Sequence, residues 1–257
     1  MRWLLYPLYE WHLLRAVTNL PMPNHVGIIL DGNRRYAKQR GLTEAREIYD
    51  LGARKLDEVL DWCDELRIRA VTLWVCSTEN LRRSPEEVSG ILAAIEEKLG
   101  ALANDPAIHH RRVRVRAAGK LGLLPGSTAA VIRKAEEATA SYDSMTLTIA
   151  VAYGGREEIV DAVRSLIRDK AKECQRVDDI AEHVTAETIA QYLYAPDLPD
   201  PDLIIRTSGE IRLSGFLLWQ SAFSEFYFSD VYWPEFRKID FLRAIRAFQQ
   251  RRRRFGK

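Results

Sequence analysis

Short apolar runs alternate along this chain with longer segments of helical periodicity, and that alternation restricts the fold more than any other feature. The apolar runs indicate buried strands at residues 25–30, 70–76, 113–117, 146–152 and 203–206. Between them, apolar side chains recur at helical spacing, as at Leu56, Val59, Leu60 and Cys63. Strands that alternate with helices in this way form a mostly parallel sheet flanked by helices. We therefore expect a single α/β domain.

The first 22 residues stand apart from this pattern. The opening MRWLLYPLYEWHLLRAV is apolar, but Glu10, His12 and Arg15 interrupt it, and its longest uncharged run is too short to span a bilayer. It also lacks the small-residue cleavage site of a secretory signal. We predict an amphipathic helical segment over residues 1–22, able to lie against a membrane surface, and a folded domain over residues 23–257.

Charge and cysteine content exclude several classes of protein. The chain has 38 basic and 36 acidic residues, and the resulting net charge of +2 argues against a nucleic-acid scaffold. Residues 237–257 nevertheless hold nine basic residues and one acidic residue. The run at residues 251–254 is either a solvated helix end or a site for an anionic lipid, a nucleic acid or a ligand held by another subunit. Three scattered cysteines indicate reduced thiols in a cytosolic protein.

Polar side chains follow the first and second predicted strands. In an open parallel sheet, ligands bind beyond the carboxyl ends of the strands. The first strand is followed by Asp31-Gly32-Asn33-Arg34-Arg35, which combines a carboxylate suited to a metal with an anion-binding turn. The alternative is an ordinary turn with two solvated arginines. Ser77 and Asn80 follow the second strand, either to hydrogen-bond a substrate or only to cap the next helix.

The densest polar cluster follows the strand at residues 203–206. It contains Arg206, Thr207, Ser208, Gly209, Glu210, Arg212 and Ser214. Burying so many polar groups is costly without partners, and a phosphate or diphosphate is a natural partner for them. Further along, Glu225 is a lone carboxylate in an aromatic stretch, where the residues alone favour a structural ion pair over a metal ligand.

Several other patterns argue for structure rather than chemistry. The sequence has no Walker A loop and no HExxH, GxSxG or GxGxxG pattern. His109 and His110 lack metal-ligand spacing and are expected on a solvent-exposed loop. We expect a surface loop over residues 169–179 and a helix start at Asp178-Asp179.

Taken together, five segments resemble the cis-prenyltransferases, the Z-isoprenyl diphosphate synthases that include undecaprenyl diphosphate synthase. The segments are HVGIILDGNRRYAKQRG, STEN, AYGGREEIVDAV, PDLIIRTSGEIRLSGFLLWQSAFSEFYF and the terminal RFG. They run in the family's order from residue 25 to the end of the chain. The resemblance implies that residues 23–257 form a catalytic domain with an apolar tunnel. It also implies a homodimer acting on isopentenyl diphosphate and an allylic diphosphate.

The resemblance further implies a role for each matching residue. Asp31 and Glu225 would bind Mg²⁺, and the catalytic group would be Asp31, Asn33, Ser77 and Asn80. The allylic diphosphate would be held by Gly32, Asn33 and Arg35, and isopentenyl diphosphate by Arg206, Arg212 and Ser214. Arg254 and Gly256 would reach the isopentenyl diphosphate of the partner subunit. Flanking residues expected to contact substrate are Arg34, Tyr36, Ser77, Thr78, Glu79, Leu81 and Arg83.

The sequence departs from the family pattern at several positions. Arg34 stands where the family has a glycine, and Tyr49 falls at the histidine of a GHxxG pattern. Arg34 or Arg46 is therefore a candidate for the missing phosphate contacts. Val75 stands where long-chain members tend to have a small residue, and added bulk shortens a close-packed tunnel.

We therefore expect a short-chain product, such as C15 Z,E-farnesyl diphosphate. The alternatives are a long-chain undecaprenyl diphosphate synthase, a non-catalytic partner subunit, and a phosphate-binding hydrolase. Retention of the motif residues argues against the second alternative, and the lack of an evident nucleophile argues against the third. We expect a cytoplasmic protein without a nucleic-acid partner, in peripheral contact with the inner face of a membrane.

Overall fold

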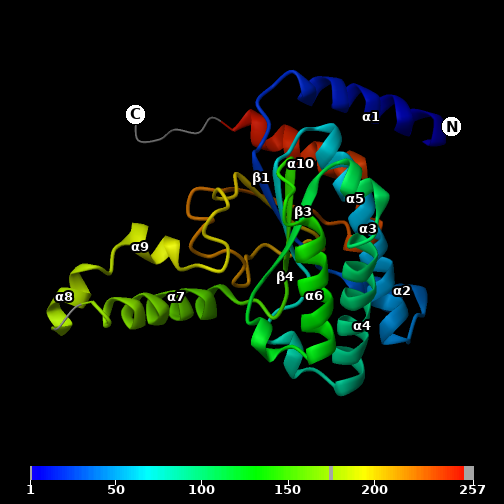
Figure 1. Ribbon diagram of the computed structural model, residues 1–257. Helices are drawn as coiled ribbons and strands as arrows, with labels where there is room; N and C mark the ends of the chain where they lie inside the picture. Colours follow the sequence, from blue (N-terminus) through cyan, green and yellow to red (C-terminus); the bar gives the residue numbers. More distant parts are fainter. Residues whose placement is uncertain (1, 174–175, 252–257) are drawn as a thin grey trace.

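A six-stranded parallel sheet lies at the centre of the protein, for which a computed structural model describes residues 2–173 and 176–251 (Figure 1). The strands follow the order β3-β4-β2-β1-β5-β6, and all neighbouring pairs are parallel. Their bounds are His25–Ile29 (β1), Ala70–Trp74 (β2), Val113–Ala118 (β3), Met145–Ala150 (β4), Leu203–Arg206 (β5) and Glu225–Phe228 (β6). The single α/β domain predicted from the alternating pattern is confirmed.

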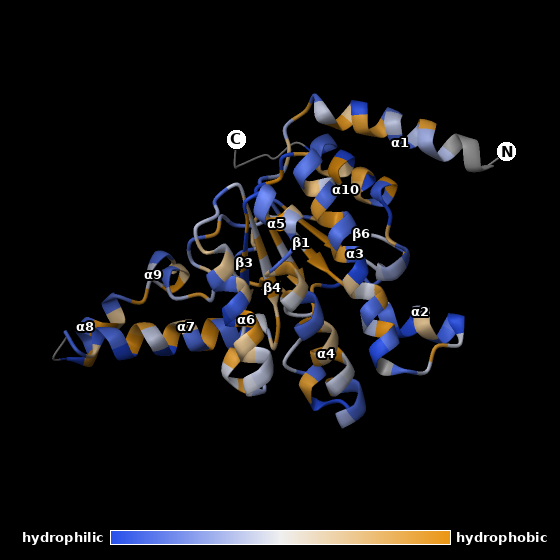
Figure 2. Cartoon of the chain, turned by 45° about the vertical axis from the view of Figure 1, so that its right-hand side comes forward, coloured by the Kyte–Doolittle hydropathy of each residue, from blue (hydrophilic) through white to orange (hydrophobic). Residues whose placement is uncertain are grey.

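Helices connect these strands and cover the sheet. Their bounds are Arg2–Thr18 (α1), Asn33–Arg40 (α2), Ala45–Glu65 (α3), Pro85–Leu102 (α4), Pro106–His110 (α5), Gly126–Thr139 (α6), Gly155–Lys170 (α7), Val177–Glu182 (α8), Ala186–Gln191 (α9) and Lys238–Gln250 (α10). Short 3₁₀ turns span Asn80–Arg82, Leu121–Leu123 and Trp233–Glu235. In Figures 1 and 2, α7 and α8 extend away from the body of the molecule, while α3, α4 and α6 lie along the sheet.

The main hydrophobic core joins the sheet to α3, α4, α6 and α10. Figure 2 shows the central strands as hydrophobic, as expected for parallel strands that are buried on both sides. A smaller core contains Phe216 and Leu217 from the loop after β5, which pack with Ile29, Ile204 and Tyr153. Loop residues thus complete the core next to the carboxyl ends of β1 and β5, where the polar clusters of the sequence lie.

The five predicted strands are present within two residues of their expected ends, and β6 was not predicted. Within the described residues, Glu225–Phe228 pairs with β5 alone and forms an edge of the sheet, and all four of its residues are half-buried. A strand buried on one face alternates apolar and polar residues, and a strand buried on both faces is a continuous apolar run. This aromatic stretch has neither pattern. Its pairing with β5 is a long-range contact that the local pattern does not report.

Three local expectations can be compared with the helices. The sequence Ser84-Pro85-Glu86-Glu87 predicts a helix start, and it is confirmed, because Ser84 caps α4 by accepting a hydrogen bond from the Glu87 amide and Pro85 lies in the first turn. Asp178 and Asp179 lie in the first turn of α8, as expected. The prediction of a surface loop over residues 169–179 was wrong at both ends, because α7 continues to Lys170 and α8 begins at Val177.

His109 and His110 do not lie on the solvent-exposed loop that the sequence led us to expect. They lie in the last turn of α5. The His109 ring is half-buried and hydrogen-bonds to the Tyr142 hydroxyl and the Ala103 carbonyl at 3.0 and 3.1 Å. These bonds tie α5 to the preceding helix and to the turn before β4, so His109 has a structural role.

Helix α1 packs across α10 near the far end of α3 (Figure 1). Leu13 and Val17 are fully buried in the main core, whereas Tyr6, Leu8, Tyr9 and Trp11 are exposed. Proline at position 7 falls inside this helix. Among residues 2–173 and 176–251, no helix is both long enough and apolar enough to cross a membrane.

His25 at the start of β1 makes the stability of the fold sensitive to pH. The buried imidazole contacts the Pro199 carbonyl through Nδ1 at 2.6 Å and the Thr72 hydroxyl through Nε2 at 2.8 Å. These partners suit the neutral ring, and burial lowers the pKa of His25 below its usual value of 6.5. Below pH 6.5 the unfolded chain therefore binds a proton that the folded chain does not, and stability falls as the pH decreases.

We expect the free energy of unfolding to drop with decreasing pH below 6.5, by up to about 1.4 kcal/mol per pH unit from this group. Urea denaturation at pH 7.5, 6.5 and 5.5 measures it. His25→Asn should flatten this part of the profile, whereas His183→Asn, at an exposed position after α8, should not. An unchanged pH profile in His25→Asn would contradict the assignment.

Candidate active site

The polar clusters that follow β1, β2 and β5 meet at one edge of the sheet. β1 lies between β2 and β5, and Ile29 pairs with both Trp74 and Arg206, so the three strands end at the same level. The loops beyond them surround an open cavity of about 620 Å³. The expected site residues that line it are Asp31, Gly32, Asn33, Arg34, Arg35, Ser77, Glu79, Asn80, Arg83, Arg206, Arg212 and Ser214.

Asp31 lies at the centre of this group, two residues after β1. Its carboxylate accepts hydrogen bonds from Arg206 at 2.7 Å and from Arg35 at 3.3 Å. Burial by itself would raise the pKa of Asp31, but hydrogen bonds from Arg206 and Ser208 and the charges of Arg206 and Arg35 outweigh it and lower the pKa. Asp31 is therefore an anion at neutral pH, as a metal ligand must be.

Arg206 is the last residue of β5, and only 5% of its surface is exposed. Besides Asp31, it donates to the Ser214 hydroxyl at 2.8 Å and to the Arg212 carbonyl. Its Nε–H is buried and lacks a hydrogen-bond partner within the part of the chain that the structure describes. A buried cation with an unused donor is well placed to bind an anion in the cavity.

Gly32 turns the chain from β1 into α2, whose first residues line the cavity. Its φ angle of +103° is in the left-handed region, and a Cβ atom there would lie 2.5 Å from Cδ1 of Tyr232. Only glycine fits both conditions. The helix begins at Asn33, and the first amides of a helix have no partner within it, so they attract anions.

Arg35 and Arg212 flank a second carboxylate, Glu210. Arg35 donates to Glu210 at 3.0 Å and to the Ser208 hydroxyl at 2.7 Å, and Arg212 donates to the other oxygen of Glu210. The carboxylate thus occupies the space between two guanidinium groups that line the cavity. Two cations held this close together form a strong site for a multiply charged anion such as a diphosphate.

Ser77 and Asn80 bind each other at the end of β2. The Ser77 amide donates to the Asn80 side chain at 2.9 Å, and the Asn80 amide donates to the Ser77 hydroxyl at 3.1 Å. These bonds hold the loop rigidly while both residues line the cavity. The two residues thus hold the turn after β2 rather than cap the short helix that follows, and their position in the cavity wall agrees with the substrate-facing alternative.

A second polar network lies at the rim, where the sequence departs from the family pattern. Glu87 of α4 accepts hydrogen bonds from Tyr49 at 2.8 Å and Arg83 at 2.6 Å, and Arg34 lies 3.6 Å away. Burial alone would raise the pKa of Glu87, but the Tyr49 hydrogen bond and the charges of Arg83 and Arg34 lower it. Sequence reasoning missed Glu87, because an acid in the first turn of a helix is explained by the helix dipole alone.

Arg46, the other candidate for replacing the missing phosphate contacts, lies elsewhere. It pairs with Glu97 at 2.6 Å and with Asp50 at 3.7 Å on the outer surface of α3 and α4, and it does not line the cavity. Of the two candidates, the structure brings only Arg34 to the site.

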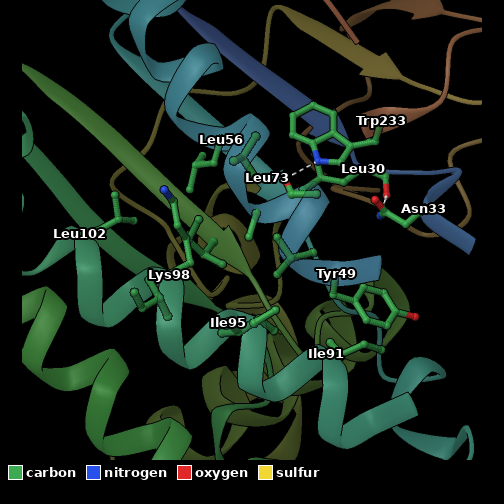
Figure 3. Close-up of a pocket in the computed structure, with 16 residues that line it drawn as sticks. Leu30, Asn33, Tyr49, Leu56, Leu73, Ile91, Ile95, Lys98, Leu102 and Trp233 are labelled. Atoms are coloured by element: carbon green, nitrogen blue, oxygen red, sulfur yellow. Dashed lines mark hydrogen bonds between the residues drawn. The ribbon is translucent and has the colours of Figure 1, made fainter. Parts of the chain in front are cut away.

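An apolar cavity continues from the polar one between α3, α4 and the sheet (Figure 3). Both cavities share Leu30, Asn33, Tyr49, Val75 and Ile91 in their walls. Beyond these residues the wall is formed mainly by aliphatic side chains, among them Leu56, Leu73, Ile95 and Leu102. Its volume is small, about 70 Å³.

Several expected site residues lie elsewhere. Tyr36 points along α2, where its ring packs under Arg40, and Thr78 and Leu81 do not line the cavity. Leu81 instead packs against the main core. Arg254 and Gly256 lie outside the described residues.

The structure places Asp31 and Glu225, the metal pair that the resemblance implies, far apart within the chain. Glu225 begins β6 and pairs with Leu203, three residues before Arg206 on β5, whereas Asp31 lies beyond the level of Arg206. At about 3.3 Å per residue, the two carboxylates are separated by more than about 10 Å along the strands. Glu225 instead pairs with Arg251 at 2.5 Å, the structural ion pair that the residues alone favoured.

Asp31 nevertheless suits a magnesium site that a substrate completes. Among the described residues, no group of three or more histidine, cysteine or acidic side chains is arranged to hold a metal. Mg²⁺ commonly binds through one or two carboxylates together with substrate phosphates and water, which is the donor set that Asp31 and a bound diphosphate would supply. Cys76, in the same cavity, is no candidate nucleophile, because burial raises the pKa of its thiol to about 11.

Sequence comparisons agree with this geometry. The model of a family described as "Putative undecaprenyl diphosphate synthase" matches residues 29–256. A tritrans,polycis-undecaprenyl-diphosphate synthase (geranylgeranyl-diphosphate specific) of Methanopyrus kandleri is 54% identical over 98% of this chain and 91% of its own. A (2Z,6E)-farnesyl diphosphate synthase of Thermobifida fusca is 51% identical over 98% of this chain and 97% of its own.

A solved structure shows the same architecture. The lavandulyl diphosphate synthase from Lavandula x intermedia, determined in complex with dimethylallyl diphosphate, superposes with a TM-score of 0.83 at 34% sequence identity. The match covers 92% of this chain and 99% of that one. The likeness therefore extends over the whole sheet and its covering helices.

Proposed function

The chain belongs to the undecaprenyl diphosphate synthase family and is a cis-prenyltransferase, and from this premise we propose that it condenses isopentenyl diphosphate with an allylic diphosphate into a short-chain Z product. The observation that carries the proposal is that an arginine-lined cavity and a small apolar one lie side by side and share part of their walls. The first suits two diphosphates, and the second suits a hydrocarbon chain of limited length.

Two anion-binding walls face each other across Asp31. We assign the allylic diphosphate to Gly32, Asn33 and Arg35, where the open amides of α2 lie next to a guanidinium group. We assign isopentenyl diphosphate to Arg206, Arg212 and Ser214. Arg34 and Arg83 at the rim supply further positive charge on the allylic side, in place of the family's histidine pattern.

The chemistry requires the allylic diphosphate to leave. Asp31 would hold Mg²⁺, which would neutralise charge on the departing diphosphate. The arginines and helix amides are fixed in place before the reaction and stabilise the same developing charge. The carbon–oxygen bond to the allylic diphosphate then breaks, the isopentenyl double bond attacks the cationic carbon to form the new carbon–carbon bond, and the proton lost to give the Z alkene passes to the released diphosphate. Ser77 and Asn80 orient the reacting groups, and the aliphatic wall excludes water from the cation.

Product length follows from the apolar cavity. Val75 lies in the wall that both cavities share, so its side chain narrows the entrance to the apolar part. The family also includes proteins named as undecaprenyl synthases, and a long-chain product is the alternative. The small volume of the cavity favours the short one.

We expect mass spectrometry of the reaction products to show mainly C15 diphosphate from isopentenyl and geranyl diphosphates. Val75→Ala should shift the products upward by one or more isoprene units, because it removes two methyl groups from the narrow part of the wall. Val88→Ala on α4, outside both cavities, is the matched control and should leave the product unchanged. A dominant C50–C55 product from the unaltered protein would contradict the short-chain proposal.

A homodimer is part of the proposal. Ile211 and Phe223 are 79% and 78% exposed, and Val160 on α7 also faces outward. Large apolar side chains exposed to this degree are typical of subunit interfaces. Light scattering should give twice the chain mass of 29.5 kDa, and Phe223→Glu should shift the protein toward monomer. A fully active monomer would contradict the dimer, and inactivity of the pure protein that another subunit restores would support the non-catalytic alternative.

We further propose a cytoplasmic protein in which residues 1–22 form a peripheral membrane contact and residues 23–257 form the catalytic domain. Guanidinium groups of Arg237 and Arg243 lie over the exposed rings of Tyr6 and Tyr9 at 5.1 and 5.5 Å. Aromatic rings next to basic groups are typical of membrane–water interfaces. Co-sedimentation with anionic phospholipid vesicles should weaken in Trp11→Ser, and equal binding would contradict the contact.

A further inference from the structure

Lys98 is a charged residue in the wall of the apolar cavity. It lies on α4, and its neighbours in the wall include Leu56, Ile95 and Leu102 (Figure 3). Tyr49 and Asn33, the polar residues at the junction with the diphosphate cavity, lie at the opposite end in the same view. A lysine in such a wall is unusual, because its ammonium group is stable only with water or an anionic partner nearby.

The partner of Lys98 is Asp57, on the helix across the cavity. The Lys98 ammonium donates to the Asp57 carboxylate, which links α4 to α3. The lysine side chain is 17% exposed and that of Asp57 is 53% exposed. The methylene groups of Lys98 therefore line the apolar space, while its charge is held at the outer opening between the two helices.

The position of Lys98 along α4 sets the length of hydrocarbon that can lie between the junction of the two cavities and this residue. Ile91 lies at the junction of the two cavities, and Lys98 follows it by seven residues, or about 10 Å at 1.5 Å per residue. One isoprene unit extends the chain by four carbon–carbon bonds of about 1.5 Å each, or roughly 5 Å after bond angles are included. The span from the junction to Lys98 therefore equals about two extended isoprene units.

We propose that Lys98, held in place by Asp57, determines where chain elongation stops. This inference rests on the proposed short-chain function. Val75 lies at the entrance of the apolar cavity, and Lys98 would limit the length of the product chain at the far end of the same cavity. A third isoprene unit beyond the junction would press apolar carbon against the ammonium group and displace its water or its carboxylate partner. Because hydrocarbon cannot replace either partner, the cost rises sharply at this point, and release becomes faster than further elongation.

The charge, rather than the volume, of Lys98 carries the effect, so the decisive variant keeps the volume and removes the charge. For Lys98→Met, we expect the ratio of products longer than C15 to C15 to rise about tenfold, which corresponds to about 1.4 kcal/mol in the competition between elongation and release. Lys98→Arg, which retains the positive charge, should keep the product distribution of the unaltered protein. The readout is mass spectrometry of products from isopentenyl and geranyl diphosphates, at equal consumption of isopentenyl diphosphate.

Lys55→Met is the matched control. Lys55 is a partly buried lysine on α3 that pairs with Glu58 on its own helix and does not line the apolar cavity. Its replacement removes the same charge from the same pair of helices and should leave product length unchanged. If Lys98→Met does not fold, Asp57→Asn tests the same inference at an exposed position, because Lys98 is then no longer held across the opening.

The outcomes separate this inference from the proposed function. No condensation product from the unaltered protein would refute the proposed function itself, and a C50–C55 product would refute both the short-chain proposal and the role of Lys98. A C15 product that persists in Lys98→Met would overturn the role of Lys98 alone. Lengthening in Lys55→Met to the same degree would also overturn it, since the effect would then be a general loss of charge.

Discussion

Asp31→Asn is expected to lower kcat about a thousandfold, the largest effect on activity that we predict from a single substitution. Asparagine keeps the size of the side chain and an oxygen that can accept from Arg206, but it loses the charge needed to bind Mg²⁺ with the substrate. Loss of one group that stabilises charge in the transition state commonly costs about 10²–10³ in kcat, and loss of a metal ligand costs at least as much.

Initial rates over a range of Mg²⁺ concentrations measure this effect, and calorimetry with a non-reactive diphosphate analogue measures the metal affinity directly. Asp61→Asn is the control, because Asp61 is an exposed carboxylate on α3 that pairs with Arg111. A kcat for Asp31→Asn within tenfold of the unaltered protein would show that Asp31 is not the metal ligand. The structure also favours asparagine over alanine here, since alanine would leave Nη2 of the buried Arg206 without the carboxylate that it contacts.

Arg206→Ala is expected to raise the KM for isopentenyl diphosphate about a hundredfold and also to destabilise the fold. The guanidinium group supplies two or more charge-assisted hydrogen bonds to an anion in the cavity, and each is worth about 1.5–3 kcal/mol. Removing it leaves the Asp31 carboxylate without its closest cation. Breaking a fully buried pair costs about 3–5 kcal/mol, and because Asp31 is partly exposed we expect about 2–3 kcal/mol.

The two effects can be separated with Arg206→Lys. Lysine keeps a positive charge near Asp31, so most of the stability should return, but a single ammonium cannot reproduce the forked contacts to Asp31 and Ser214. Steady-state kinetics at saturating allylic substrate gives the KM, and urea denaturation gives the stability. An unchanged KM in both variants would mean that isopentenyl diphosphate binds elsewhere.

Much of the fold follows from local pattern. Apolar runs at residues 25–30 and 203–206 became β1 and β5 within one residue, since the burial of a parallel strand on both sides requires a continuous apolar stretch. The edge strand β6 was missed because one side of it is unpaired and its residues are only half-buried. Because β6 was missed, the sequence did not show that Glu225 begins this strand, at the opposite end of the strands from Asp31 within the chain.

The candidate site was predicted well wherever its residues directly follow a strand. Asp31, Ser77 and Arg206 meet because parallel strands end at one edge of the sheet, a rule that needs no coordinates. Glu87 and Lys98 could not be predicted in this way. They lie about three turns apart on α4, and their partners Tyr49 and Asp57 lie 38 and 41 residues earlier on α3.

The amino-acid sequence alone therefore determined the class of fold, the edge at which ligands bind and the diphosphate chemistry of that edge, because each depends on residue type and short-range periodicity. Only the tertiary structure shows that Glu225 lies, within the chain, at the opposite end of the strands from Asp31. It also places Glu87 next to Arg34 and Arg83 at the rim, and Lys98 in the wall of the apolar cavity. Those facts depend on strand register and on how α3 packs against α4. Both are set by the summed packing of many distant side chains, which no single stretch of sequence records.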